Sequence, residues 1–192
     1  LDVLEEVFKV LEVVRDDADV ASKICLTIRT LAVNDNICKD ITKLGGTELL
    51  VKIMNQHIEH VKFCTYACTA IKMISNNDAN KALLCANGGI DIILSAMSRH
   101  SDDVAMQTQG LAALSSMALR NTKNCVHIAK GHGISLIASM KNDLEGHKLR
   151  HKLISFDRNH THQLLTPLGR AYKQFDDVVT ALAPFRYSVV IE

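Results

Sequence analysis

Cysteine and histidine pairs four residues apart are the first features of this sequence that could do chemistry. Cys64 and Cys68 form one pair, and His147 and His151 form another. On a helix, each pair would place two metal-ligand side chains on one face. However, Cys64 falls in an apolar stripe, and neither a third ligand near the histidines nor a Cys-x-x-Cys motif is present. We therefore predict core thiols and surface imidazoles, with no metal site and no cofactor; a metal- or small-molecule-binding protein is the alternative.

The common catalytic motifs are also missing from the sequence. The sequence contains no Gly-x-Ser-x-Gly, no Gly-x-x-x-x-Gly-Lys and no His-Glu-x-x-His, the patterns of acyl transfer, phosphate binding and zinc-dependent hydrolysis. Carboxylates cluster at Asp16, Asp17 and Asp19, and again at Asp102 and Asp103. Both clusters precede a predicted long helix, where an Asp side chain caps the N-terminus and favours the helix dipole. We expect helix capping from these residues and no enzymatic activity.

Composition sets the broad class. The 192 residues are 47% hydrophobic and 22% charged, with a formal net charge of +1, as in an ordinary globular domain with its own core. No apolar run is long enough to span a membrane, and no secretory signal is visible. Since the chain opens at Leu1 rather than Met, we expect a part of a longer chain or a larger complex. Six cysteines among aliphatic residues indicate reduced thiols and a cytoplasmic location, with a nuclear or ciliary one also compatible: Cys25, Cys38, Cys64, Cys68, Cys85 and Cys125.

One phrase occurs three times in the chain. It reads "LGGTELLVKIM" at Leu44–Met54, "NGGIDIILSAM" at Asn87–Met97 and "GHGISLIASM" at Gly131–Met140. Glycines and asparagines mark a common step of 43 or 44 residues: Gly46, Gly89 and Gly133; Asn36, Asn80 and Asn124. A period of about 40–47 residues is typical of stacked helical repeats.

Apolar spacing within the units predicts helices. Residues at offsets of three and four form one stripe per unit: Ala21, Ile24, Ile28 and Leu31; Cys64, Ala67, Ile71 and Ile74; Gln107, Gly110, Leu114 and Met117. Small residues at Ala67 and Gly110 indicate close helix approach. We expect the glycines to end a short helix in the left-handed conformation, with a second helix starting after each pair.

The segment "GGIDIILSAMSRHSDDVAMQTQGLAALSSMALRNTKN" (Gly88–Asn124) shows the full order of features: a Gly-Gly break, a helix ending in Met, a polar His-and-Asp loop and a long Ala/Leu helix. This order resembles the armadillo repeat family, nearest to the armadillo repeat-containing protein 6-like repeats, over Val20–Ile154. The resemblance implies an all-α fold, a right-handed armadillo-type α-solenoid. Its array would cover residues 1–154, in units of about 1–33, 34–77, 78–121 and 122–154.

Both ends depart from the repeat. Leu1–Arg15 reads as an amphipathic helix with Leu4, Val7, Phe8 and Leu11 on one face, the second helix of a truncated first unit. After Ile154 the pattern fails, because Asp157 would stand at a core position. We predict that residues 155–192 form an atypical capping or docking tail, helical over Thr161–Leu182 and then extended. A mobile tail that docks elsewhere is the alternative.

The resemblance implies that the long helices line a concave groove that binds partners. The groove row would hold Lys23, Thr27, Thr30 and Asn34; Tyr66, Ala70, Met73 and Asn77; and Gln109, Ala113, Ser116 and Arg120. Nuclear-import adaptors of this family use a ladder of Trp and Asn. This chain has no Trp, and Thr30, Met73 and Ser116 stand where the Asn is expected, which disfavours an import-signal receptor. Tyr66 and Met73 would anchor a partner peptide; a solvated face is the alternative.

Charge is uneven along the chain. Residues 1–20 contain seven acids and two bases, and residues 120–152 contain seven bases and two acids, with four histidines. The basic stretch suits an acidic partner, RNA or a lipid surface, or end-to-end pairing with a copy or a neighbouring part of the chain. Because this stretch lacks aromatic residues that stack bases, nucleic acid is disfavoured.

These observations predict a non-enzymatic protein-interaction scaffold that presents a concave helical groove to a partner protein or peptide. No small-molecule substrate and no membrane span are expected. The alternative is a structural subunit of a large ciliary or cytoskeletal assembly, which would contact its neighbours through its ends and tail.

Overall fold

The computed structural model describes residues 2–130, 133 and 136. The predicted tail, residues 155–192, and most of the unit predicted at 122–154 lie outside them. Every regular element of the described part is an α-helix. The helices are α1 (Asp2–Val13), α2 (Ala18–Leu31), α3 (Asp35–Lys43), α4 (Gly46–Gln56), α5 (Val61–Ile74), α6 (Asp78–Ala86), α7 (Gly89–Arg99), α8 (Val104–Ala118) and α9 (Thr122–Lys130).

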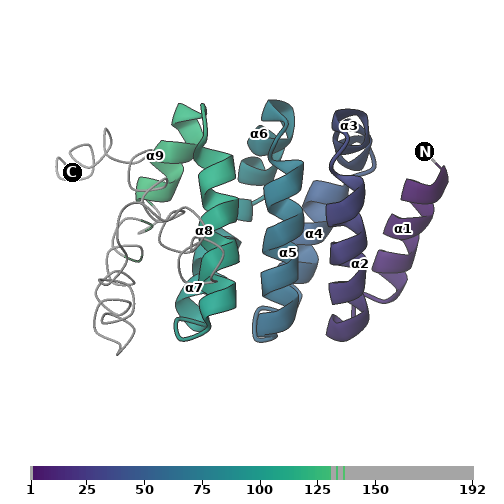
Figure 1. Ribbon diagram of the computed structural model, residues 1–192, viewed down its shortest axis with the longest axis horizontal. Helices are drawn as coiled ribbons and strands as arrows, with labels where there is room; N and C mark the ends of the chain where they lie inside the picture. Colours follow the sequence, from purple (N-terminus) through teal and green to yellow (C-terminus); the bar gives the residue numbers. More distant parts are fainter. Residues whose placement is uncertain (1, 131–132, 134–135, 137–192) are drawn as a thin grey trace, which may run out of the picture.

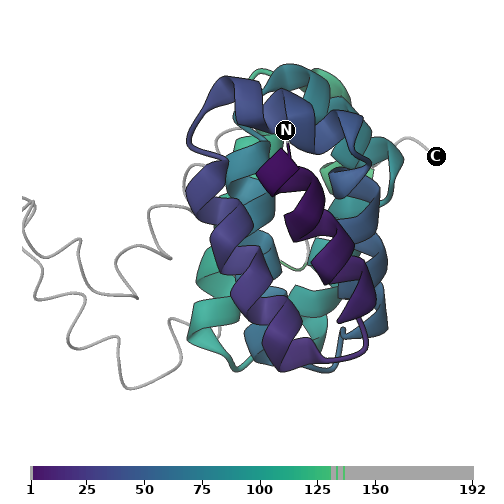
Figure 2. The same cartoon turned by 90° about the vertical axis from the view of Figure 1, so that its right-hand side faces the viewer.

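The helices are stacked as repeated units. The long helices α2, α5 and α8 stand side by side in one row, with α4 and α7 behind them and the short helices α3, α6 and α9 together at one end (Figure 1). α5 packs against α2 on one side and α8 on the other. Each full unit is thus a short, a middle and a long helix, α3–α5 and then α6–α8. α1 takes the place of a middle helix beside α2 at the N-terminal end (Figure 2).

Recurring polar side chains start the long helices. Asp17 caps α2 by accepting hydrogen bonds from the amides of Asp19 and Val20 at 3.0 and 3.1 Å. Asp103 caps α8 by accepting from the amide of Met106 at 2.7 Å. One residue of each carboxylate cluster therefore caps a long helix as predicted, whereas Asp16 accepts from Gln56 and Asp19 lies 3.7 Å from Lys62. His60 caps the intervening helix α5 by accepting from the amide of Phe63 through its ring nitrogen. The N-cap position is therefore occupied by a side-chain acceptor in all three long helices, although the residue type differs.

Glycine conformation separates the short helices from the middle ones. Gly45 and Gly88 lie in the left-handed region with φ of 72° and 83°, as expected for residues that end α3 and α6. The next helix begins at the second glycine of each pair, Gly46 or Gly89, one residue earlier than predicted. The helix can begin one residue earlier because only the first glycine of each pair has a positive φ. The second glycine adopts a helical conformation and forms the first residue of the next helix.

The predicted apolar stripes form the core, with one exception. Ile28, Ile71 and Leu114 are fully buried. Gly110 lets α8 approach α7 closely, since a Cβ there would lie 2.5 Å from Met97 Sδ; this confirms the expected close contact. The exception is α2, where Ile24 and its neighbour on the stripe, Leu31, are only half-buried. No described helix packs on α2 on the side where α5 has α2.

The structure corrects the predicted equivalence of Asn36, Asn80 and Asn124. Asn80 and Asn124 lie three residues after the asparagines that begin α6 and α9, and both are buried. Asn36 lies two residues after the N-cap Asn34 of α3 and is exposed. Ile37 is the true structural equivalent in that unit. The repeat step grows from 43 to 44 between the last units because α8 has one residue more than α5.

Candidate interaction surfaces

The predicted groove row divides into three environments. Its exposed members are Lys23, Thr27, Thr30, Asn34 and Arg120, and its half-buried members are Tyr66, Met73, Asn77, Gln109 and Ser116. Ala70 and Ala113 are fully buried. The two alanines belong to the packed core and contribute no surface to the row. The remaining residues do not form one uniform strip.

Tyr66 and Met73 lie seven residues apart on α5, so both stand on one side of that helix. Both side chains are half-buried and pack against the core cluster. Their counterparts on α2, Lys23 and Thr30, are exposed. The central long helix therefore carries the most apolar part of the row. We call Tyr66 and Met73 the α5 surface pair.

Two asparagines of the row have structural roles. Asn34 Oδ1 accepts from the amide of Asn36 at 2.8 Å, and Asn77 Oδ1 accepts from the amide of Ala79 at 3.0 Å. These bonds satisfy free amides at the starts of α3 and α6. Arg120 joins α8 to α9 with a positive φ of 55°. The backbone at these three positions is committed to helix ends, which reduces their freedom to adapt to a partner.

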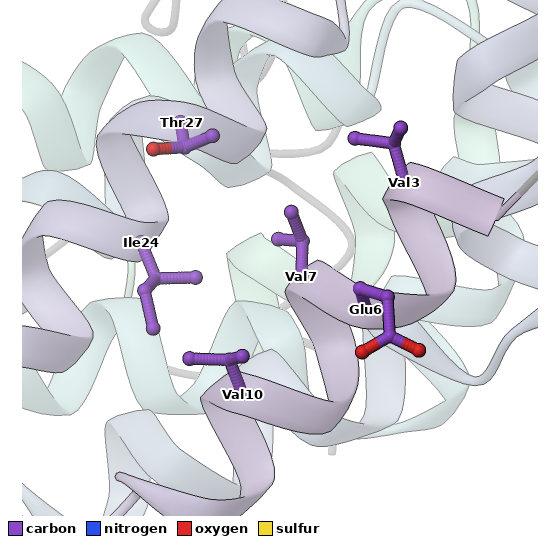
Figure 3. Close-up of a pocket in the computed structure, with 6 residues that line it drawn as sticks. All are labelled: Val3, Glu6, Val7, Val10, Ile24 and Thr27. Carbon is purple, nitrogen blue, oxygen red and sulfur yellow. The ribbon is translucent and has the colours of Figure 1, made fainter.

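Sequence reasoning did not find the hollow at the N-terminal end. A groove of about 440 Å³ lies between α1 and α2 and is lined by Val3, Glu6, Val7, Val10, Ile24 and Thr27 (Figure 3). Val10 and Ile24 point toward one another across it, and the Glu6 carboxylate points away from the valines. We call it the α1–α2 groove. The sequence feature that could have revealed it is the set of valines on α1, Val3, Val7 and Val10. Val3 and Val10 lie outside the single apolar face that was predicted for that helix.

A second hollow of about 420 Å³ lies between α1 and α4. Phe8, Leu44 and Leu49 give it an apolar base. Charged residues of both signs surround that base: Glu5, Lys9, Glu12, Glu48 and Lys52. Mixed charges at a rim give little preference for a ligand of either sign, so this hollow is a weaker candidate than the α1–α2 groove.

The cysteines are packing residues in the described structure. Burial raises the pKa of Cys25 and of Cys64 to about 12, and it raises the pKa of Cys68 well above its usual value. The Cys64 thiol donates to the carbonyl oxygen of His57 at 3.4 Å. No three His, Cys, Asp or Glu side chains of the described residues converge as metal ligands. His147 and His151 lie outside those residues.

Polar contacts recur where each long helix begins. His57 Nε2 lies 2.5 Å from the carbonyl oxygen of Arg15, and His100 Nε2 lies 2.7 Å from that of Ile58. Beside them, Gln56 donates to Asp16 and Arg99 donates to Glu59. All four contacts join one unit to the preceding one, and the second pair repeats the first 43 residues further along the chain. They hold neighbouring units in register at that end of the stack.

The two charge-rich regions differ in how much of them is described. The acidic N-terminal region lies on α1 and the loop to α2, where Lys9 is paired with Glu6 at 2.8 Å. Of the basic region, the structure describes Arg120, Lys123 and Lys130, all exposed. His127, on α9, contacts Asp91 of α7 at 2.9 Å. Of the acidic residues on α1, Glu6 lines the α1–α2 groove, whereas Glu5 and Glu12 line the hollow between α1 and α4.

No helix in the described part of the chain is both long and apolar enough to cross a membrane. No protein-family model matches the sequence. A search of curated proteins likewise gives no match. Among solved structures, the chain resembles the crystal structure of an engineered protein determined by the Northeast Structural Genomics Consortium. The two share 17% sequence identity with a TM-score of 0.67, over 96% of this chain and 68% of the other. At this identity the likeness concerns the fold alone: an all-helical arrangement.

Proposed function

We propose that this protein is a non-enzymatic interaction scaffold built as a right-handed armadillo-type α-solenoid. The support comes from the recurrence of one unit: a left-handed glycine before each middle helix and a capped start to each long helix, at 43-residue spacing. Neighbouring units bury a continuous core, and such arrays present extended surfaces instead of enclosed active sites. The six free cysteines are compatible with a reducing, cytoplasmic compartment.

The observation that carries the proposal is the α5 surface pair. Tyr66 and Met73 are half-buried at the surface of the central long helix, with α2 and α8 on either side. Aromatic and thioether side chains provide contact area that adapts to a peptide or helix of a partner protein. Lys23, Thr30, Gln109 and Ser116 flank them as polar contacts on the neighbouring helices.

Affinity capture followed by mass spectrometry tests this proposal. We expect the Tyr66→Ala/Met73→Ala double variant to lose a partner that the wild-type chain retains. The matched control is Val33→Ala/Leu83→Ala, which also truncates two partly exposed apolar side chains but outside the row. Circular dichroism must show equal helicity for all three proteins. Equal retention by the wild type and the Tyr66/Met73 variant would argue against this surface.

The alternative function, a structural subunit that contacts its neighbours through its ends, has one observation in its favour. The N-terminal end of the stack carries the open, apolar α1–α2 groove. Deletion of residues 155–192 and substitution in the groove would separate the two functions. Loss of a large complex on either change, with the Tyr66→Ala/Met73→Ala variant unaffected, would favour the structural subunit.

A further inference from the structure

The long helices carry a positive charge that the other helices of the full units lack. α2, α5 and α8 together contain four bases and one acid, whereas α3, α4, α6 and α7 each contain equal numbers of bases and acids. The four bases are Lys23 and Arg29 on α2, and Lys62 and Lys72 on α5. Positive charge is therefore concentrated on the row of helices that carries the α5 surface pair.

Three of these bases have charges that are not neutralised within the described residues. Lys62 Nζ lies 3.7 Å from Oδ1 of Asp19, the acid of α2. Lys23, Arg29 and Lys72 form no ion pair in the part of the chain that the structure describes. Their side chains reach solvent, since the first two are exposed and Lys72 is half-buried.

Lys72 stands on the side of α5 that faces α8. It follows Thr65 by seven residues, which is about two helical turns, so both residues lie on one side of the helix. The Thr65 hydroxyl contacts Met106 Sδ of α8 at 3.8 Å. Lys72 therefore points into the space in front of the α5–α8 contact, next to Met73 of the surface pair.

Arg29 occupies the same position on α2 that Lys72 occupies on α5, one 43-residue step earlier. It therefore stands on the side of α2 that faces α5. Because α5 lies between α2 and α8 (Figure 1), the two bases lie on opposite sides of Met73. Lys23 is the counterpart of Tyr66 by the same step, so a third base lies beside the other member of the pair.

Acids near the ends of the row do not cancel these charges. Asp78, at the start of α6, is paired with Lys81 at 2.8 Å. Asp35 begins α3 and lies outside the long helices. Arg120 follows α8 at the same end of the stack and adds a further exposed base. The surface around Tyr66 and Met73 thus combines an apolar centre with a basic border.

We propose that the α5 surface pair binds an acidic peptide segment of another protein, with Asp or Glu on both sides of an aliphatic or aromatic residue. The apolar residue packs on Tyr66 and Met73. The carboxylates meet Arg29 and Lys72 on the two sides of that contact, where charge-assisted hydrogen bonds fix the orientation of the peptide. This inference rests on the proposed function, because it names the partner of the same surface.

Other acidic occupants fit the surface less well. Strong binding to DNA typically uses about 6–10 phosphate contacts, more than the bases around the pair provide. The acidic helix of this chain, α1, is held in its own core by Leu4, Phe8 and Leu11. It is therefore not free to leave the stack and to fill the row of a second copy.

Selection of a random-peptide library displayed on phage, against the complete 192-residue chain, tests the proposal without a known partner. We expect the selected peptides to carry Asp or Glu next to an apolar residue. A labelled peptide from the selection is then titrated by fluorescence anisotropy. Raising NaCl from about 0.1 to 0.5 M should weaken its binding, because salt screens charges at an exposed surface.

Matched variants locate the binding. Arg29→Glu/Lys72→Glu should weaken the selected peptide by about tenfold or more, since it replaces two attractive charges with repulsive ones. Lys39→Glu/Lys52→Glu makes the same change in net charge at exposed positions of α3 and α4, and it should leave binding almost unchanged. Circular dichroism of each variant confirms that the helices are intact. Tyr66→Ala/Met73→Ala should also weaken the peptide.

The outcomes separate this inference from the proposed function. Selected peptides that need Tyr66 and Met73 but are neutral or basic, or that bind Arg29→Glu/Lys72→Glu as well as wild type, would overturn the acidic partner and leave the scaffold in place. Equal losses in the two charge-reversal variants would show attraction by net charge alone, and would also overturn it. Peptides that bind the Tyr66→Ala/Met73→Ala variant as well as wild type would refute the proposed function itself.

Two further results would replace the peptide with another occupant and so overturn the proposal. One is displacement of the selected peptide by single-stranded oligouridine at a lower concentration than by unlabelled peptide, because the surface would then favour nucleic acid. The other is a dimer, seen by light scattering, that Arg29→Glu/Lys72→Glu dissociates, because the surface would then bind a second copy.

Discussion

The side chain of Asn80 donates a hydrogen bond from Nδ2 to the carbonyl oxygen of Cys38 at 2.9 Å, across the boundary between two units. The same Nδ2 lies 3.3 Å from the carbonyl oxygen of Ile74 in its own sequence vicinity. Asn124 repeats this arrangement toward Lys81 and Met117, at 3.5 and 2.9 Å. Both asparagines are almost completely buried. They satisfy carbonyl groups at the ends of long helices, and they join each short helix to the one before it.

Asn80→Ala should lower the free energy of unfolding by about 1–3 kcal/mol, because it removes the hydrogen bonds of a buried side chain to Cys38, Ile74 and Thr42. Asn36→Ala is the control. That residue is exposed and should cost no more than about 0.5 kcal/mol. Urea unfolding followed by circular dichroism measures both. A cost for Asn36→Ala equal to that of Asn80→Ala would contradict the register described above.

Gly88→Ala should destabilise the protein by about 1–2 kcal/mol, because an L-residue with a Cβ is strained at a φ of 83°. No atom lies within 4 Å of a Cβ added there, so the cost comes from the backbone alone. Gly88→Asn should cost less, since Asn adopts the left-handed region more readily than Ala does. Thermal unfolding of the two variants gives the comparison, and equal losses would argue against this explanation.

Native-state alkylation should modify Cys85 first. It is the one half-buried cysteine of the six, all of which lie in the described residues. Its pKa is also raised, by burial and then by Asp91, so its reaction should be slow at neutral pH and accelerate as pH rises. Cys25, Cys64 and Cys68 should react only after unfolding.

Peptide mass mapping after timed exposure to iodoacetamide measures these rates. Cys85→Ser should remove the first modification without creating another. Modification of Cys68 in the folded protein at the rate of Cys85 would show that the core opens more often than its packing implies.

Asp78 should make stability depend on pH in the acid range. Its hydrogen bond with Lys81, at 2.8 Å, and the charge of that lysine hold the pKa of Asp78 below its usual 3.8. A carboxyl group with a lowered folded-state pKa stabilises the protein above the unfolded value, and the effect is lost as pH falls through the folded value. Asp78→Asn should therefore be less stable than wild type at pH 7 and equally stable at about pH 2.

Asp35→Asn is the matched control for that measurement. Asp35 begins α3 as Asp78 begins α6, but the residue three positions later is Cys38 in place of a lysine. Urea midpoints between pH 2 and 7 should converge in acid for Asp78→Asn and wild type. A gap that persists at pH 2 would mean that Asp78 acts through packing or capping alone.

The sequence by itself determined where most helices begin and how they repeat. Asp17, Asp103, Gly45 and Gly88 act locally, through caps and backbone conformation, and local interactions can be read from residue types at fixed spacing. The 43-residue step and the face of α1 with Leu4 and its neighbours were predicted for the same reason. Helicity and the core stripes follow from patterns within one segment.

Only the tertiary structure decided which residues face solvent. Thr27, Ala70 and Ala113 occupy one position in the repeat, yet the first is exposed and the other two are buried. Their environments differ because a preceding long helix packs against α5 and against α8, whereas no described long helix precedes α2. Periodicity identifies a face of a helix, but burial depends on what packs against that face. The α1–α2 groove and the buried position of Asn80 are therefore properties of the stack of helices.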